Sequence, residues 1–314
     1  MWDFPLFPEQ ASSLAGWVDG VFFYALGLTV FFTTLVLVLI LFFAIKYRRG
    51  SRADRSNPVT HNTTIEVIWI GIPLALSLVL FFAATYVFYH QYQPPRDASE
   101  VYVLGRQWMW ETSHPEGRRE INMLHVPVGR PVRLTMTSQD VIHSFYIPAF
   151  RVKQDVIPGR YTTMWFKPTK PGTYHLFCAE YCGTLHSAMV GKVVVMEPTQ
   201  FQEWLTSGSV QGSMASEGEA LFRRYGCSGC HGRNATVRAP LLDGVYGHAV
   251  PLADGRVITA DERYIRDSIL RPRSEVVAGY DPVMPTFENQ INESDLLKII
   301  DYIKSIANTE GAQR

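Results

Sequence analysis

A short segment of the chain, from Cys178 to Met189, holds residue types that could bind a redox metal. It contains two thiols, at Cys178 and Cys182, followed by the imidazole of His186 and the thioether of Met189. Sulfur ligands of this kind select copper over hard cations, and a Cys/His set with a weak Met is typical of electron-transfer copper. Two thiols beside one local histidine suggest two metal ions bridged by both sulfurs. Such a site requires a second histidine, and His143 is the best candidate.

Two simpler sites would also use this cysteine pair. In an extracytoplasmic domain, two nearby cysteines often form a disulfide, and a Cys/His cluster can hold structural zinc. Neither site requires His186 and Met189 to follow so closely, or Glu180 to lie between the thiols. The local spacing therefore favours copper over zinc or a disulfide.

A second cysteine pair belongs to the pattern Cys227-Ser228-Gly229-Cys230-His231. Cys-x-x-Cys-His is typical of c-type haem attachment, in which the thiols form thioethers with the porphyrin and the histidine becomes the proximal iron ligand. A redox dithiol is the alternative, and the adjoining histidine argues against it. The two pairs use all four cysteines, so none remains for a disulfide framework.

Methionine is the usual second haem ligand in cytochromes c, where it raises the reduction potential. We expect Met284 in this role, because it precedes Pro285 and lies just before a helix predicted from Asn292 onward. The alternatives are Met214, whose surroundings indicate a linker, and His248, on a Gly-flanked loop. Apolar residues recur at helical spacing in the final helix, at Leu296, Leu297, Ile300, Ile303 and Ile306.

Two apolar stretches nearer the N-terminus are long enough to cross a bilayer. They run from about 21 to 45 and from about 65 to 89, with the basic segment 46–55 between them. A dense Lys/Arg cluster beside a span marks the cytoplasmic side. The sequence therefore predicts a helical hairpin, with the N-terminus and everything after Tyr92 outside the cytoplasm. The formal net charge of +0 over 314 residues gives no reason to expect a nucleic-acid partner.

Short alternating runs separated by Pro and Gly follow the hairpin, at 101–104, 131–136, 161–166 and 192–195. Regularly spaced runs of this kind indicate a β-sandwich or barrel. The segment from Cys178 to Met189 then lies on a loop between the last two strands, where a rigid sheet can hold its ligands.

The expected domains follow from these changes in pattern. Within the last one, Ser216-Glu217-Gly218-Glu219 has capping-box spacing and predicts the start of a helix. The Gly- and Ser-containing stretch before it is typical of a flexible joint, with a short possible helix around 201–205. The domains are a transmembrane hairpin over 1–95, a copper domain over 96–198, a linker over 199–215 and a cytochrome domain over 216–314.

The pattern Cys-x-Glu-x-Cys-Gly-x-x-His-x-x-Met closely resembles the dinuclear copper (CuA) motif of cytochrome c oxidase subunit II. The stretches 140–145 and 157–160 resemble the first-histidine region of the same family. The resemblance further implies a magnesium ion, held at the catalytic subunit by the side chain of Glu180. The copper ligands that it implies are bridging Cys178 and Cys182, one nitrogen each from His143 and His186, and the weak axial Met189 and Glu180 carbonyl.

Two further roles come from the resemblance. Trp108 matches the first Trp of Gly-x-Gln-Trp-x-Trp, which in the family lies over the copper site and admits electrons from cytochrome c. Arg106 and Met109 depart from the commoner pattern and alter the surface around that residue, while Trp110 is expected to be core. Glu66 matches the carboxylate of Glu-x-x-Trp at the entrance of a proton-uptake path. The alternative for Glu66 is a solvated first-turn carboxylate.

Almost the whole chain resembles subunit II of the caa-type bacterial haem-copper oxidases, which carry a fused C-terminal cytochrome c. The implied fold is a multidomain membrane protein with a two-helix transmembrane hairpin, a cupredoxin-like β-sandwich and an all-α class I cytochrome c domain. The stretch 239–247 resembles the cytochrome segment in which the carbonyl of Pro240 would orient the proximal histidine. The implied location is the bacterial inner membrane.

The resemblance also implies a function and partners. Electrons would pass from a cytochrome c or another periplasmic carrier through haem c and copper to haem in subunit I. There, among the other oxidase subunits, oxygen would be reduced to water and protons pumped. One alternative is the electron-transfer subunit of a CuA-containing nitric oxide reductase. Another is a non-catalytic membrane-anchored copper-binding protein, which would have no use for a covalent haem. The sequence leaves open whether Trp108 serves the tethered haem or an external cytochrome.

Overall fold

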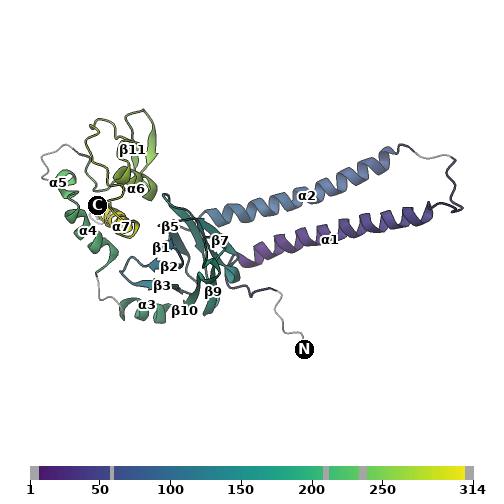
Figure 1. Ribbon diagram of the computed structural model, residues 1–314, viewed down its shortest axis with the longest axis horizontal. Coiled ribbons are helices and arrows are strands. Elements are labelled where there is room, and N and C mark those ends of the chain that lie inside the picture. The colour runs from purple at the N-terminus through teal and green to yellow at the C-terminus, as the bar shows by residue number, and fades with distance from the viewer. Residues whose placement is uncertain (1–6, 57–59, 208–211, 233–238, 308–314) are drawn as a thin grey trace.

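The computed structural model describes residues 7–56, 60–207, 212–232 and 239–307, and Figure 1 shows their arrangement. Two long antiparallel helices, α1 (Ala15–Lys46) and α2 (Thr63–Tyr92), form a hairpin that projects from the rest of the protein. Their mean hydropathy reaches 2.9 and 2.5, and the apolar windows are not buried within the chain. Both helices contain the predicted spans and continue past them, and Asn62 caps α2 by accepting a hydrogen bond from Ile65 N at 3.1 Å.

The base of the hairpin is fixed to the domain that follows it. Arg151 donates from Nε and Nη2 to the two carboxylate oxygens of Asp19 in α1, at 2.7 and 2.9 Å, and both side chains are buried. The same guanidinium donates to the carbonyl of Pro8 at 2.7 Å. On α2, the carbonyl of His90 accepts from Trp165 Nε1 at 2.9 Å. Both helices are therefore held by buried or part-buried polar contacts where they meet the domain.

Residues 99–196 form the β-sandwich domain, which consists of two five-stranded sheets. The predicted strands at 101–104, 131–136, 161–166 and 192–195 are confirmed as β1, β5, β8 and β10. The first sheet has the order β3 (Arg119–Ile121), β2 (Met109–Ser113), β1 (Ser99–Arg106), β5 (Val132–Ser138), β8 (Thr162–Phe166). The second has the order β4 (Met123–Pro127), β10 (Val190–Met196), β9 (Gly172–Cys178), β6 (His143–Ile147), β7 (Val152–Val156).

Alternation along the strands separates a core face from an outer face, as a period of two requires. In β1, Val101 and Val103 point into the sandwich core, whereas Glu100, Tyr102 and Leu104 lie on the outer face of the first sheet. Tyr102 and Leu104 are nevertheless buried. The outer face of this sheet must therefore be covered by another part of the chain.

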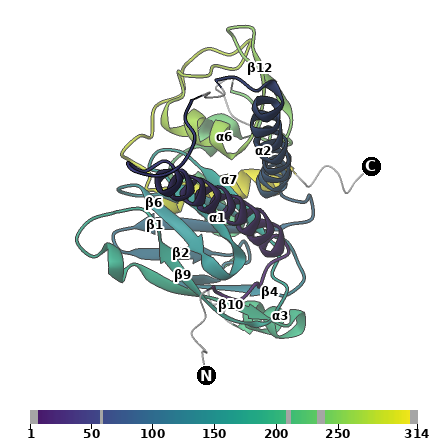
Figure 2. The ribbon, with the colours of Figure 1, turned by 90° about the vertical axis from the view of Figure 1, so that its right-hand side faces the viewer.

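A helix, α3 (Pro198–Ser207), follows the sandwich and is longer than the short helix predicted around 201–205. Its Trp204 stacks on the His125 ring with centroids 4.5 Å apart, and Leu205 is buried. Figure 2, which looks along the hairpin, places α3 beside β4 and β10 at one edge of the sandwich. This half of the predicted linker is packed, and the stretch 208–211 lies outside the described residues.

The C-terminal domain is the described part of 214–307. Its helices are α4 (Met214–Arg224), α5 (Ser228–His231), α6 (Glu262–Leu270) and α7 (Glu293–Ala307), and a small sheet pairs β11 (Ala249–Pro251) with β12 (Val257–Thr259). The helix start predicted at Ser216 is wrong. Ser213 is the N-cap, and its hydroxyl accepts from Ser216 N at 3.2 Å. Gly218 allows α4 to cross α7 closely, since a Cβ there would lie 1.9 Å from the Lys298 carbonyl oxygen.

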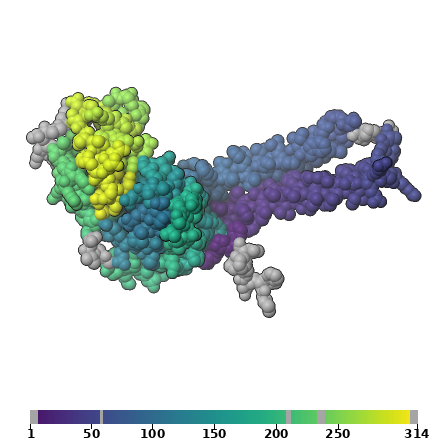
Figure 3. Space-filling model, in the orientation of Figure 1, coloured from purple at the N-terminus to yellow at the C-terminus, as the bar shows by residue number. Residues whose placement is uncertain are grey.

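The C-terminal domain covers the outer face of the first sheet, and Figure 3 shows it seated on the sandwich. Met214 is only 2% exposed and packs between Tyr102 and Leu297, so its prediction as linker is wrong. Tyr102 donates to Asp301 at 3.0 Å, and Lys304 Nζ lies 3.1 Å from the Tyr102 hydroxyl. These contacts with the C-terminal domain account for the low exposure of Tyr102 on the outer face of the first sheet.

Lys304 is the cation at the centre of this interface. Its ammonium group pairs with Glu100 of β1 and, at 3.0 Å, with Glu262 of α6. Arg133 of β5 adds a second cation, 3.3 Å from Glu262. We name this set, with Tyr102 and Asp301, the interdomain network. It joins two domains through partly desolvated charges, for which the loss of one partner is costly.

Asp301 makes the stability of the docked protein depend on pH. Burial raises its pKa to about 6, against the lowering effects of the Tyr102 hydrogen bond and of Lys304. The unfolded chain has an Asp pKa of about 3.9. The stabilising contribution of the bound proton is therefore complete below about pH 4 and is lost as the pH rises to about 6.

A chain with Asp301→Asn should not lose stability between pH 4 and pH 6. Above pH 6 it should exceed the native chain in free energy of unfolding by about 3 kcal/mol, because the pKa of Asp301 is raised from about 3.9 to about 6 and each pKa unit is worth about 1.4 kcal/mol. Urea titrations at pH 4 and pH 7, followed by tryptophan fluorescence, measure the difference. Parallel pH profiles for the two chains would show that Asp301 is not the titrating group.

Candidate copper and haem sites

Strand pairing brings the first two candidate copper ligands together. His143 is the first residue of β6 and Cys178 is the last of β9, and the two strands pair antiparallel with Phe145 opposite Cys178. The loop that follows carries Cys182 and His186 and ends at Met189, next to β10. A hydrogen bond of 3.1 Å from Cys178 N to the Met189 carbonyl closes the loop. The metal loop thus lies between the last two strands, as predicted.

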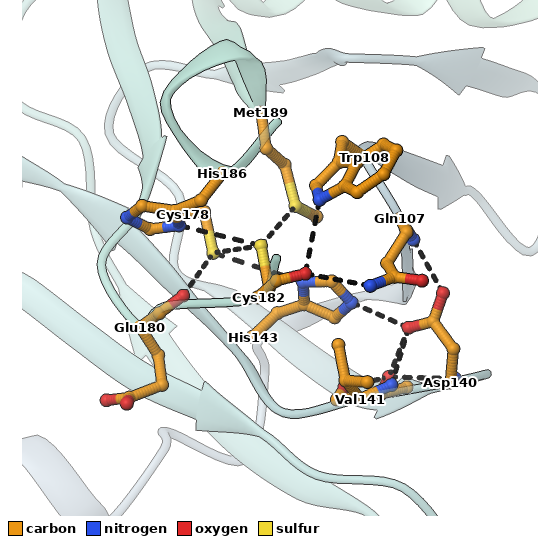
Figure 4. Close-up of polar contacts among 11 residues, drawn as sticks. Gln107, Trp108, Asp140, Val141, His143, Cys178, Glu180, Cys182, His186 and Met189 are labelled. Carbon is orange, nitrogen blue, oxygen red and sulfur yellow. Dashed lines mark hydrogen bonds and ion pairs between the residues drawn. The ribbon is translucent and has the colours of Figure 1, made fainter. Parts of the chain in front are cut away.

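The donor atoms form one continuous cluster around the two thiols (Figure 4). The sulfurs of Cys178 and Cys182 are 3.8 Å apart. Cys178 Sγ is 3.9 Å from His143 Nδ1 and 3.2 Å from the Glu180 carbonyl oxygen. Cys182 Sγ is 3.5 Å from His186 Nδ1 and 3.9 Å from Met189 Sδ. The predicted ligands are therefore brought together, with the thiols at the centre.

These spacings fit a shared metal centre. Two thiolates bound to one tetrahedral ion at about 2.3 Å stand about 3.8 Å apart, and a thiolate and an imidazole stand about 3.5 Å apart. His143, Cys178 and Cys182 keep all their donor atoms within 4.8 Å of one another, whereas His186 is not a member of this compact set. His186 contacts this set by the approach of its Nδ1 to Cys182 Sγ.

The protonation of the two thiols also favours a bound metal. Burial raises the pKa of Cys178, but its contacts with His143 and with the Ser144 and Glu180 backbones outweigh burial and lower it to about 6. Burial and the neighbouring Cys178 thiolate raise the pKa of Cys182 to about 12. Two thiolates at this spacing therefore need added positive charge, and a bound metal ion deprotonates a coordinating thiol outright.

Residues around the ligands hold them in place. Asp140 Oδ1 is 2.8 Å from His143 Nε2, which leaves Nδ1 facing Cys178, and Asp140 Oδ2 accepts from Gln107 N at 2.6 Å. The side chains of Gln107 and Trp108 both donate to the Cys182 carbonyl, at 2.9 and 3.1 Å. The sequence interpretation missed Asp140 and Gln107. A carboxylate three residues before a candidate ligand histidine was the available signal, since such histidines usually pair with one.

The remaining residues of the predicted copper region have separate positions. Trp110 is fully buried and contacts the Phe145 ring with centroids 5.0 Å apart, which confirms core packing. The Glu180 side chain points away from the sulfurs into solvent, while its carbonyl faces Cys178 (Figure 4). A magnesium role for that carboxylate stays a prediction.

Asp140→Asn should weaken copper binding by roughly 10- to 100-fold, the usual effect of removing the carboxylate partner of a ligand histidine. The variant keeps the size of the side chain and removes its negative charge. Competition with a copper chelator, carried out on the full chain, measures the affinity. Asp97→Asn, at an exposed carboxyl, is the control. Equal affinity in both variants would exclude Asp140 from the site.

The second candidate site is a cavity of about 770 Å³ in the C-terminal domain. Cys227, Cys230 and His231 line it, and His231 Nδ1 lies 2.8 Å from the Pro240 carbonyl. This is the contact that the sequence resemblance predicted. It leaves Nε2 of the ring for an iron atom, since the other nitrogen is already used. The apolar lining, two thiols and oriented imidazole fit a covalent haem.

Met284 lines the same cavity as the thiols and His231. Of the two alternatives for the distal ligand, His248 is exposed and lies outside the lining, and Met214 is buried at the domain interface. The structure therefore favours Met284. Glu66 lies in the first turn of α2, where Oε1 is 2.9 Å from His61 Nδ1.

Comparisons with known proteins cover every domain. The family model "Cytochrome C oxidase subunit II, transmembrane domain" matches residues 1–89 and "Cytochrome C oxidase subunit II, periplasmic domain" matches 117–197. The model "Cytochrome c" matches 215–307.

Relatives align across these domain boundaries. A cytochrome c oxidase subunit 2 of Thermostichus vulcanus is 31% identical over 253 residues, which cover 63% of this chain and 77% of that one. A protein of the same name from Alkalihalophilus pseudofirmus is 29% identical over 288 residues, covering 86% of this chain and 82% of that one. An alternative cytochrome c oxidase subunit 2 of Bradyrhizobium diazoefficiens is 29% identical over 262 residues, covering 73% and 88%.

Proposed function

Because the chain belongs to the cytochrome c oxidase subunit II family, and its fused cytochrome c domain fits the caa type, we propose that it receives electrons for a haem-copper terminal oxidase. The observation that carries the proposal is the pairing of two redox sites in one docked chain. A sulfur-centred donor cluster lies in the sandwich, and a haem-sized cavity with two thiols lies in the domain seated on it.

The residues that would hold the copper pair are those gathered around the thiols. Cys178 and Cys182 would bridge the ions, His143 and His186 would each supply one nitrogen, and Met189 and the Glu180 carbonyl would be weak ligands. When bound, the copper pair and the haem each supply one-electron redox chemistry at nearly fixed geometry. The chain's part is to keep the ligands still, and their anchoring by paired strands and by Asp140, Gln107 and Trp108 does this.

The haem would be held by thioethers to Cys227 and Cys230, with His231 as proximal and Met284 as distal ligand. The apolar cavity wall excludes water and so favours the less charged state of the iron site. The Pro240 carbonyl fixes the orientation of the His231 ring. Neither set of residues cleaves or forms a substrate bond, so the chain itself would only transfer electrons.

The other subunits of the oxidase are its partners, as membership of the family implies. We further propose that electrons come from a cytochrome c or another periplasmic carrier and leave for haem in subunit I, where oxygen is reduced and protons are pumped. The two apolar helices form the membrane anchor of a periplasmic domain. In the proposed bacterial inner membrane, Glu66 would lie at a proton-path entrance, and the Glu180 carboxylate would bind magnesium at subunit I.

The alternatives fit less well. A CuA-containing nitric oxide reductase could use the same modules, but the relatives described above carry the name of an oxidase subunit. A copper-binding protein without redox function would not need the cavity around Cys227, Cys230 and His231.

Electron paramagnetic resonance of the oxidised full chain, with copper and iron analysis, tests the proposal. The expected result is one unpaired electron shared over two copper nuclei, with one iron per chain. A single-copper signal, or zinc in place of copper, would overturn the assignment around Cys178. A chain without iron would overturn the haem site.

A further inference from the structure

One contact between the domains reaches toward the candidate copper site. Arg266 of α6 donates from Nη1 to the carbonyl oxygen of Gly159 at 2.8 Å, and its side chain is only 5% exposed. Gly159 belongs to the turn between β7 and β8 and has φ +76°, a conformation that favours glycine. A buried guanidinium of the C-terminal domain therefore donates a hydrogen bond to the backbone of a tight turn in the β-sandwich domain.

The guanidinium is held from several sides. Nη2 pairs with Glu293 at 2.5 Å, and Nη1 lies 3.5 Å from Asp267, so the buried charge is balanced within the C-terminal domain. The Tyr161 ring packs beneath it, with its centroid 5.8 Å from the guanidinium carbon. Arginine suits this position because its planar fork satisfies several acceptors in fixed directions.

The helix that carries Arg266 is also a wall of the haem cavity. Ile265, Ser268 and Ile269 of α6 line that cavity. Arg266 is adjacent to Ile265 in sequence but reaches the β-sandwich domain instead. A single helix thus separates the cavity from the turn at Gly159.

From that turn, a short path of bonded and hydrogen-bonded groups leads to His143. Pro158, next to Gly159, forms a β-bridge with Ser138. The Ser138 hydroxyl accepts from Asp140 N at 3.2 Å, and Asp140 Oδ1 contacts His143 Nε2. In addition, Val156 at the end of β7 pairs directly with His143. The turn therefore adjoins the histidine side of the donor cluster.

Trp108 contacts the cluster at Cys182. Its indole donates to the Cys182 carbonyl, and it sits in the turn between β1 and β2. Within residues 7–56, 60–207, 212–232 and 239–307, no hydrogen bond links Trp108 to the C-terminal domain. The direct polar link between α6 and the turn at Gly159 is made by Arg266.

We propose that Arg266 is a positioning residue for internal electron transfer, which enters the copper centre from the His143 side through the Gly159 turn. The inference rests on the proposed function. The haem, when bound, would supply one electron and the copper pair would accept that electron, with no bond made or broken. Transfer between fixed centres depends steeply on contact between the groups that lie between them, and Arg266 makes such a contact at Gly159.

The test uses the full chain loaded with haem and copper. A light pulse first reduces the haem. Transfer to the copper is then measured as the decay of the ferrous haem absorbance, together with the appearance of reduced copper. The variants are Arg266→Gln and Arg266→Lys. Arg263→Gln is the matched control, because this exposed arginine on the same helix makes only a 3.8 Å contact to Glu275.

We expect Arg266→Gln to slow the internal transfer by roughly tenfold or more, since small misplacements of reacting groups have effects of this size. Arg266→Lys should recover part of the rate, because an ammonium group can still donate to Gly159. Arg263→Gln should transfer at the native rate. Reduction of the copper by a small external reductant, and both midpoint potentials, should be unchanged by Arg266→Gln.

A structural readout separates positioning from loss of fold. Hydrogen exchange of the backbone amides in 157–161 should rise in Arg266→Gln alone, while amides of β6 and β9 remain protected. Native-rate transfer in Arg266→Gln would overturn the inference. Failure of the native chain to load copper or haem would overturn the proposed function instead.

Discussion

Replacing Cys182 with serine should abolish the dinuclear copper signal and reduce electron delivery to the catalytic subunit by more than about 100-fold, the upper range for changes around a metal site. Cys182 Sγ contacts the Cys178 sulfur, His186 Nδ1 and Met189 Sδ, so it links three donors. A serine oxygen is a harder ligand that copper does not select. Resonance spectra with copper analysis measure the centre, and turnover with a reduced external cytochrome measures delivery.

Ser187→Ala is the control on the same loop, because Ser187 is exposed and adjoins a candidate ligand without being one. It should keep the signal and the activity. The Cys182→Ser chain should keep its covalent haem, since Cys227 and Cys230 lie in another domain. A native dinuclear spectrum in Cys182→Ser would refute the bridging role.

Lys304→Ala should destabilise the docked arrangement of the two domains by about 3–5 kcal/mol, the usual cost of removing one partner of a buried ion pair. Lys304 pairs with Glu100 and Glu262 and adjoins Tyr102. Burial raises the pKa of Glu262, but Lys304 and Arg133 outweigh burial and lower it to about 2. Without Lys304, the carboxylates would face each other with Arg133 as the remaining cation of the network.

Urea unfolding of the full chain, followed by tryptophan fluorescence, measures this loss, and limited proteolysis between the domains reports whether they separate. Arg223→Ala removes a cation from an exposed pair with Glu219. Such a pair contributes at most about 1 kcal/mol. Equal stability of the two variants would show that the interdomain network does not hold the domains together.

Local sequence patterns predicted the elements and most of the copper loop. Alternation in 101–104 and 192–195 identified strands because each has one face in the core. The apolar spans identified the hairpin because each is long and apolar enough to cross a bilayer, and the described parts of the chain leave both unburied. Cys178, Cys182, His186 and Met189 lie so close in sequence that their spacing alone indicated a shared site.

Contacts between distant segments could not be predicted in this way. Tyr102 and Asp301 meet across two domains, and no periodicity in either segment encodes the partner. Met214 resembled linker because its neighbours are small and polar, yet it fills the interface beneath Tyr102. The capping motif at Ser216 was misplaced because Ser213, three residues earlier, offers an equivalent hydroxyl. Arg266 carried no motif, and only docking brings it the carbonyl oxygen of Gly159.

The pairing of Arg151 with Asp19 makes a rigid connection between helix α1 and the domain that carries the candidate copper ligands. Arg151 follows β6, the strand that begins with His143, and it grips α1 through both carboxylate oxygens of Asp19. A tilt of the hairpin is therefore passed to the ligand cluster as a rotation of the whole domain. Since helices adjust their tilt to the thickness of the hydrocarbon layer, lipid composition becomes a determinant of the height and angle of the candidate copper site above the membrane.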